Sequence, residues 1–129
     1  MRTLIILLVE DDIDDRENFI EATAKINLPL KCFTVSNVPQ AIELLRDNYF
    51  LPDFIFLDLN LPGENGKMLL EKITEENLKK SIPIIVYTTS VSGTEKEECM
   101  RLGATKFITK PPSFLEIQKA IEEVVMEPA

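Results

Sequence analysis

The chain has 129 residues, of which 45% are hydrophobic, and it carries a formal net charge of −8. This length and apolar content fit one compact domain over residues 1–129 and exclude a disordered chain. The acidic balance disfavours nucleic acid and anionic membranes as partners, because both are bound through Lys and Arg. No apolar stretch approaches the ~20 residues that span a bilayer, and Cys32 and Cys99 form no CxxC motif, so we expect a cytoplasmic protein.

The predicted elements alternate between strands and helices along the whole chain. Apolar runs predict the strands, and amphipathic segments lie between them. The first, third and fourth runs are almost continuously apolar, which is typical of strands that are covered on both faces. The five predicted strands are Leu4–Val9, Leu30–Val35, Phe54–Leu57, Ile84–Tyr87 and Lys106–Thr109.

The predicted helices follow the strands one by one. The first would turn Ile13, Ile20 and Ala24 towards the core, with Phe19 and Ile26 beside them. The fourth is mostly polar and would start from a capping box at Thr94. Five strand–helix units in strict alternation predict an α/β fold, a doubly wound parallel sheet with right-handed crossovers. The core positions of the other helices are predicted as Val38, Ala41, Ile42 and Leu45; Leu69, Leu70 and Ile73; and Phe114, Ile117, Ile121 and Val124.

Polar side chains gather where the predicted strands end. In a doubly wound sheet, ligands bind beyond the carboxyl ends of the strands, so these side chains should meet at one rim. Taken singly, each has an ordinary interpretation: an acid before a helix caps it, and a lone lysine is solvated. The side chains are Glu10, Asp11 and Asp12 after the first strand, Asp58 after the third, Thr88 after the fourth and Lys110 after the fifth.

The acids of this rim indicate a bound cation. Two carboxylates about 5 Å apart repel by roughly 3 kcal/mol at an effective dielectric constant of about 20. The chain has no His and no Cys near the rim, so the ligands would all be oxygen atoms, which suits Mg²⁺ or Mn²⁺ and argues against Zn²⁺. Beside such an ion, with Thr88 and Lys110 opposite, the carboxylate of Asp58 could attack phosphorus and form an acyl phosphate.

Four motifs give the chain a resemblance to a known family. They are VEDD at the end of the first strand, DLNLPGENG at the third, PIIVYTT at the fourth and TKPP at the fifth. In this order, over essentially the whole chain, they resemble the receiver domain of two-component response regulators. The resemblance implies a flavodoxin-like sheet with strand order 2-1-3-4-5. Because no output domain follows, it also implies a stand-alone, single-domain regulator.

The resemblance implies a role for each residue of the rim. Asp58 would take the phosphoryl group from the phosphohistidine of a sensor histidine kinase or of a histidine phosphotransfer protein. Thr88 and Lys110 would hold that group, and Phe107 would act with Thr88 as a switch. The switch would change the face formed by the fourth helix, fifth strand and fifth helix, which would bind a downstream protein or a second copy of the chain in a homodimer.

The metal ligands and one backbone feature are also implied by the resemblance. Asp11 would bind the metal directly, Glu10 would act through water, and Asp58 and the backbone carbonyl of Asn60 would complete the set. The peptide bond between Lys110 and Pro111 would be cis. The chain would catalyse only its own phosphorylation and dephosphorylation, and would not be an enzyme for a separate substrate.

Other functions remain open from the sequence alone. The chain could be a phosphorelay intermediate or a phosphate sink, both of which use the same chemistry. A phosphatase of the haloacid-dehalogenase type would need an acid where Asn60 stands. A flavodoxin-like electron carrier is disfavoured because the loop EDDIDD, residues 10–15, would repel a flavin phosphate. A degenerate receiver that serves only for docking is disfavoured by the intact Asp58, Thr88 and Lys110.

Overall fold

The computed structural model describes residues 2–78, 81–89 and 93–127. Within them, parallel strands form one sheet in the order β2-β1-β3-β4-β5, which confirms the predicted fold class and strand order. Four strands have the predicted bounds, and β4 extends one residue further. The strands are β1 (Leu4–Val9), β2 (Leu30–Val35), β3 (Phe54–Leu57), β4 (Ile84–Thr88) and β5 (Lys106–Thr109).

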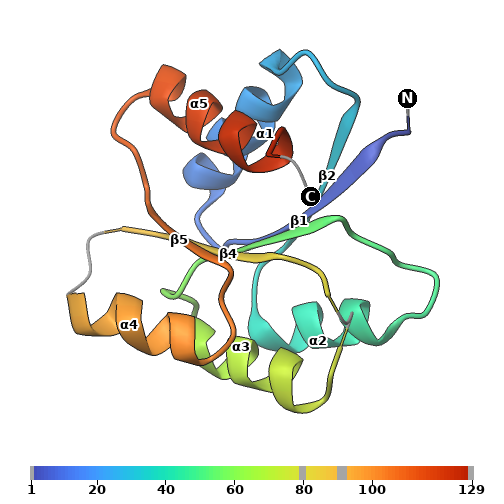
Figure 1. Ribbon diagram of the computed structural model, residues 1–129, viewed down its shortest axis with the longest axis vertical. Coiled ribbons are helices and arrows are strands. Elements are labelled where there is room, and N and C mark those ends of the chain that lie inside the picture. Colours follow the sequence, from blue (N-terminus) through green and yellow to red (C-terminus); the bar gives the residue numbers. More distant parts are fainter. Residues whose placement is uncertain (1, 79–80, 90–92, 128–129) are drawn as a thin grey trace.

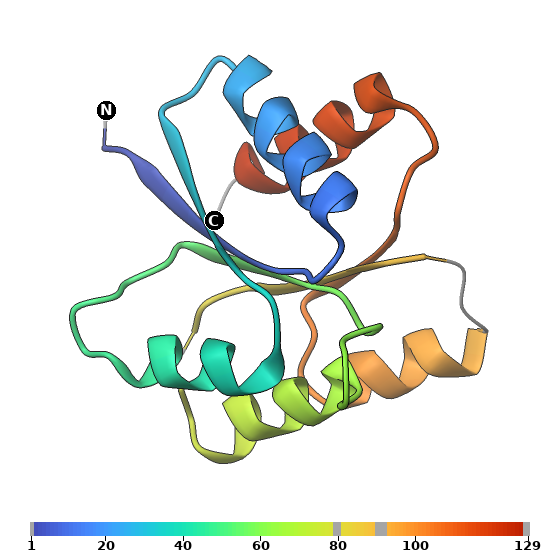
Figure 2. The same ribbon diagram turned by 180° about the vertical axis from the view of Figure 1, so that it is seen from behind.

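The helices cover both faces of the sheet (Figures 1 and 2). Helices α1 (Ile13–Lys25) and α5 (Phe114–Val125) lie on one face, and α2 (Val38–Arg46), α3 (Gly66–Glu75) and α4 (Gly93–Arg101) lie on the other. Each layer has its own apolar cluster against the sheet. The central strands β1, β3 and β4 are therefore buried on both sides, as their continuous apolar runs predict. No helix in the described residues is both long enough and apolar enough to cross a membrane.

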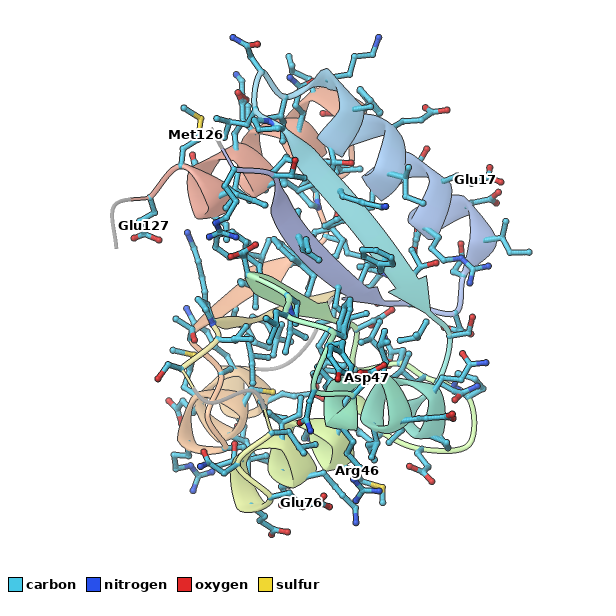
Figure 3. All side chains as sticks on the ribbon, turned by 90° about the vertical axis from the view of Figure 1, so that its right-hand side faces the viewer. Glu17, Arg46, Asp47, Glu76, Met126 and Glu127 are labelled. Carbon is cyan, nitrogen blue, oxygen red and sulfur yellow. The ribbon has the colours of Figure 1, made fainter. Side chains whose placement is uncertain are left out.

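Helix α1 buries only part of the predicted face, namely Phe19 and Ile26. Phe19 is 1% exposed, and its ring packs edge-on against Phe56 with a centroid distance of 5.0 Å. Ile13 and Ile20, which were expected in the core, are 60% and 41% exposed. The large aromatic ring reaches into the core and determines the rotation of the helix. The outer face is polar, and Glu17 points away from the sheet (Figure 3).

Side-chain caps fix the starts of the helices that follow β1 and β5. The carboxylate of Asp12 accepts a hydrogen bond from the backbone N–H of Asp15 at 2.9 Å, and the hydroxyl of Ser113 accepts one from Glu116 at 3.2 Å. Helix α4 begins at Gly93, so Thr94 lies in its first turn and is not its cap. Helices α1 and α5 therefore begin at defined positions, close to the carboxyl ends of the strands that precede them.

Candidate functional site

The carboxyl ends of the strands bring the predicted side chains together at one edge of the sheet. Glu10 and Asp11 follow β1, Asp58 follows β3, Thr88 ends β4, and Lys110 follows β5. The backbone N–H of Lys110 donates to the carbonyl of Thr88 at 2.6 Å, so β5 remains beside β4 up to the site. The parallel register of the sheet thus places side chains from separate parts of the chain within contact distance.

Asp58 is a buried carboxylate with hydrogen-bond donors on both oxygens. Its Oδ1 accepts from the Thr88 hydroxyl at 2.8 Å and from the backbone N–H of Asn60 at 3.0 Å, and its Oδ2 accepts from Nζ of Lys110 at 2.9 Å. Burial by itself would raise the pKa of Asp58, but these donors, with the side chain of Glu10, hold the pKa below its usual range. Asp58 is therefore ionised at neutral pH, which a nucleophilic carboxylate requires.

The ammonium of Lys110 is held by three carboxylates. Its Nζ lies 2.6 Å from Oε1 of Glu10, 2.8 Å from Oδ2 of Asp15 and 2.9 Å from Oδ2 of Asp58. It also lies 5.9 Å from the ring centroid of Tyr87. Burial would lower the pKa of Lys110, but the carboxylates, Asp15 first among them, raise it, so the ammonium remains charged.

Asp15 is the member of the site that the sequence analysis missed. It lies in the first turn of α1, where an acid is ordinarily a favourable partner of the helix dipole. The available signal was its spacing, since Asp15 precedes Phe19 by four residues and shares the helix face that packs on the sheet. The sequence analysis placed Phe19 only beside the core face, so the carboxylate four residues before it was overlooked.

Glu10, Asp11 and Asp58 form a group that could hold a metal ion. One carboxylate oxygen from each lies within 4.8 Å of the others. Burial raises the pKa of Glu10 to about 7, and the charge of Asp58 adds to this effect while Lys110 opposes it. Two buried carboxylates beside an exposed one are an all-oxygen donor set with an open side, which fits Mg²⁺ or Mn²⁺. Coordination by the Asn60 carbonyl stays a prediction.

Phe107 lies on the same side of the sheet as Thr88. It pairs with Val86 across the β4–β5 register, and Val86 and Thr88 point to the same face because they are two residues apart. The ring is partly buried and packs against the apolar cluster beneath α3 and α4. Thr88 and Phe107 are therefore neighbours on the face that α4 covers.

The peptide bond between Lys110 and Pro111 is trans, like every other peptide bond in the described residues. The predicted cis bond is wrong for this structure. For an X–Pro bond, the trans isomer is favoured by about 0.5–1 kcal/mol. Lys110 reaches Asp58 with the trans bond in place, so the geometry of the site does not require the cis isomer.

Comparisons with known proteins show which family the sequence matches. The sequence matches the response regulator receiver domain over residues 6–122. It is 32% identical, over 120 residues, to the phosphate regulon transcriptional regulatory protein PhoB of Pseudomonas aeruginosa; the match covers 93% of this chain and 51% of PhoB. The chain thus spans about half the length of this relative.

Solved structures give the same result over nearly the whole chain. The phosphorylated cyanobacterial phytochrome response regulator RcpA superposes with a TM-score of 0.89 and 31% identity, covering 99% of this chain and 97% of RcpA. The Mn²⁺-bound form of response regulator Rcp1 superposes with a TM-score of 0.85 and 28% identity, covering 98% of this chain and 96% of Rcp1. The sequence match and the sheet edge that carries Asp58, Thr88 and Lys110 together show that the chain belongs to the response regulator receiver domain family of two-component signalling.

Proposed function

We propose that Asp58 accepts a phosphoryl group from the phosphohistidine of a sensor histidine kinase or of a histidine phosphotransfer protein. The observation that carries the proposal is the environment of the Asp58 carboxylate. It is buried and ionised, Thr88 and Lys110 donate to its two oxygens, and Glu10 and Asp11 lie beside it. Donors that already face the carboxylate can turn to the oxygens of an arriving phosphoryl group.

The transfer is a displacement at phosphorus. An oxygen of Asp58 forms the new O–P bond while the P–N bond to the imidazole breaks. The electron pair of the P–N bond remains on the imidazole nitrogen, and the imidazole takes up a proton from solvent. The Thr88 hydroxyl and the Lys110 ammonium then donate to the phosphoryl oxygens. The chain catalyses its own phosphorylation in this way. In dephosphorylation, water attacks the phosphorus and the O–P bond to Asp58 breaks, which returns the carboxylate and inorganic phosphate. We do not propose a separate substrate.

The metal in this proposal is Mg²⁺ or Mn²⁺, held by Glu10, Asp11, Asp58 and the carbonyl of Asn60. When bound, it supplies positive charge to the phosphoryl oxygens. The chain's own acids explain why an ion would be needed, since Lys110 is one cation among several carboxylates. A cytoplasmic location is proposed with the kinase partner and agrees with the two free thiols, Cys32 and Cys99.

The output surface is proposed to be the face formed by α4, β5 and α5. If the Thr88 side chain turns towards the phosphoryl group, it vacates the space that it now fills. Phe107 lies on the same side of the sheet and can move into that space. Cys99 is the one buried residue of α4, so few apolar contacts oppose a shift of that helix. A downstream protein or a second copy of the chain would bind there. Nucleic acid and membranes are not proposed as partners because the net charge is −8.

Labelling by a small phosphodonor tests the phosphoacceptor. The protein is incubated with acetyl phosphate and Mg²⁺, and the phosphorylated fraction is measured by intact mass. We expect labelling of the parent protein and of Asp14→Asn, whose acid is exposed on α1, and none of Asp58→Asn. Equal labelling of Asp58→Asn and the parent protein would refute the assignment.

Amide spectra with beryllofluoride and Mg²⁺ test the output surface separately. Beryllofluoride mimics the aspartyl phosphate, so the proposal predicts shifts in α4 and β5 as well as at Asp58. Shifts that stay in the loops around Asp58 would leave the phosphoacceptor in place and contradict the proposed surface.

A further inference from the structure

Asp15 contacts Lys110 from α1, away from the strand ends that supply the rest of the site. Its Oδ2 lies 2.8 Å from Nζ of Lys110, as close as the carboxylates of Glu10 and Asp58. The Asp15 side chain is 40% exposed, whereas those of Glu10 and Asp58 are 1% and 4% exposed. A lysine ammonium has three N–H donors, and three carboxylates of the described residues surround this one.

The other two carboxylates have separate tasks in the proposed transfer. Glu10 and Asp58 belong to the group that could hold the metal, and an oxygen of Asp58 becomes part of the acyl phosphate. Asp15 does not belong to that group, and no step of the transfer uses it. It is therefore the carboxylate that remains on Lys110 when the phosphoryl group arrives.

We propose that Asp15 competes with the phosphoryl group for Lys110 and thereby sets how tightly the site binds phosphodonors. This inference rests on the proposed function and deepens it. Asp15 is a positioning residue, since it acts through Lys110 and does not touch the reacting atoms. The ligands whose binding it controls are small anionic phosphodonors and the phosphoryl group itself.

The competition follows from the fixed place of the ammonium. The side chain of Lys110 is 10% exposed, and Nζ lies over the ring of Tyr87 and within 2.9 Å of three carboxylates, which together hold it at this position. A phosphoryl oxygen that arrives at Nζ finds the ammonium already hydrogen-bonded to Asp15 and Asp58. A carboxylate that stays 2.8 Å from the same nitrogen cancels part of its charge and repels the arriving anion. Loss of the Asp15 charge should therefore strengthen phosphoryl binding.

The experiment compares Asp15→Asn with a matched control. Asp14→Asn makes the same change of charge one residue away on the exposed surface of α1. Beryllofluoride binding and phosphorylation by acetyl phosphate are titrated at saturating Mg²⁺. We expect Asp15→Asn to lower the half-saturating concentration of both probes by about threefold to tenfold relative to Asp14→Asn, the range that suits a half-exposed ion pair. The maximal phosphorylation rate should change by less than about twofold, because the reacting atoms are unchanged.

Two further variants separate competition from a structural effect. Asp15→Ala should lower the half-saturating concentrations as Asp15→Asn does, because both remove the charge. Asp15→Glu should restore the values of the parent protein, because a longer carboxylate on an exposed helix can still reach Lys110. A lower maximal rate without a change in the half-saturating concentration would indicate a structural role and overturn the inference.

The outcomes distinguish this inference from the proposed function. Half-saturating concentrations that are equal in Asp15→Asn and Asp14→Asn, or higher in Asp15→Asn, would refute the role of Asp15 and leave Asp58 as the phosphoacceptor. A parent protein that binds neither probe would refute the proposed function, and this inference with it.

Discussion

Gly66 lets the start of α3 pack directly against the segment that carries Asp58. It is buried, and a Cβ atom at this position would clash with the carbonyl oxygen of Asp58 and lie 2.8 Å from Cα of Leu59. Both are backbone atoms, so no side chain can rotate to make room. The backbone N–H of Gly66 also donates to the carbonyl of Leu59 at 2.9 Å. The position of the phosphoacceptor thus depends on a residue without a side chain.

Gly66→Ala should lower the free energy of unfolding by about 1–3 kcal/mol, the usual cost of overpacking a filled region. It should also slow phosphorylation of Asp58, because the backbone of that residue must shift. Chemical denaturation and acetyl phosphate labelling measure the two effects. Gly93→Ala in α4 is the control, since nothing lies within 4 Å of its Cβ position and Ala favours a helix. Equal stability of the two variants would contradict the close approach.

Asp53 connects the segment before β3 to the start of β1 through hydrogen bonds. Its Oδ2 accepts a hydrogen bond from the backbone N–H of Ile5 at 2.7 Å, and its own N–H donates to the carbonyl of Ile5 at 2.7 Å. Its Oδ1 pairs with Arg2 at 2.9 Å. Burial would raise the pKa of Asp53, but Arg2 and the Ile5 N–H hold it below its usual range. The ionised form therefore stabilises the pairing of the two strands.

Asp53→Asn should lower the free energy of unfolding by about 1 kcal/mol at pH 7, because a neutral amide oxygen accepts a weaker hydrogen bond from Ile5 than the carboxylate does. Because the pKa is lower in the folded state, this stabilisation is present above the unfolded pKa of about 3.9 and is lost as the pH falls through the folded value. The difference between variant and parent should therefore shrink in denaturation curves recorded below about pH 4.

Arg2→Gln is the control for this prediction. The Arg2 side chain is 70% exposed and the variant keeps the Ile5 hydrogen bond, so the loss should be much smaller than in Asp53→Asn. A loss in Arg2→Gln as large as in Asp53→Asn would show that the ion pair, and not the backbone contact, carries the effect.

The sequence predicts the central strands well because they are apolar runs with clear ends: β1 stops before Glu10, β3 stops before Asp58, and β4 starts after Pro83. Parallel pairing then places the strand ends at one edge, which is why Glu10, Asp58, Thr88 and Lys110 could be grouped from the sequence alone. Helix α1 was predicted less well, since it has few apolar residues and its rotation depends on the packing of Phe19 in three dimensions. The missed Asp15 and the partly wrong apolar face of α1 have this one cause.

The acid content of the whole molecule links its stability to metal. Glu10 and Asp58 are 1% and 3% exposed, and Asp11 lies beside them, in a chain whose net charge is −8. Lys110 offsets only part of this local charge. A divalent ion that binds the folded state alone would relieve the repulsion, and would shift the unfolding equilibrium by mass action.

Mg²⁺ should therefore raise the melting temperature. At roughly ten times its Kd, the added stability is about 1.4 kcal/mol. Asp11→Ala should remove most of this gain, because it takes away an exposed carboxylate of the site without opening a cavity in the core. Thermal melts with NaCl at equal ionic strength serve as the control, since screening of the net charge would act in both salts. A shift of the same size in NaCl would contradict a specific site.

The packing of the last helix on the first has a consequence for how the chain folds during its synthesis. Helix α5 lies against α1 (Figure 1) and contributes Ile121, Val124 and Val125 to the cluster that covers Phe19 and Phe56. The ribosome releases α1 early and α5 last, so this side of the sheet has no complete cover until the end of the domain emerges. A nascent chain that stops before α5 presents an apolar surface to chaperones and proteases. Quality control in the cell can therefore recognise an incomplete domain from one side alone.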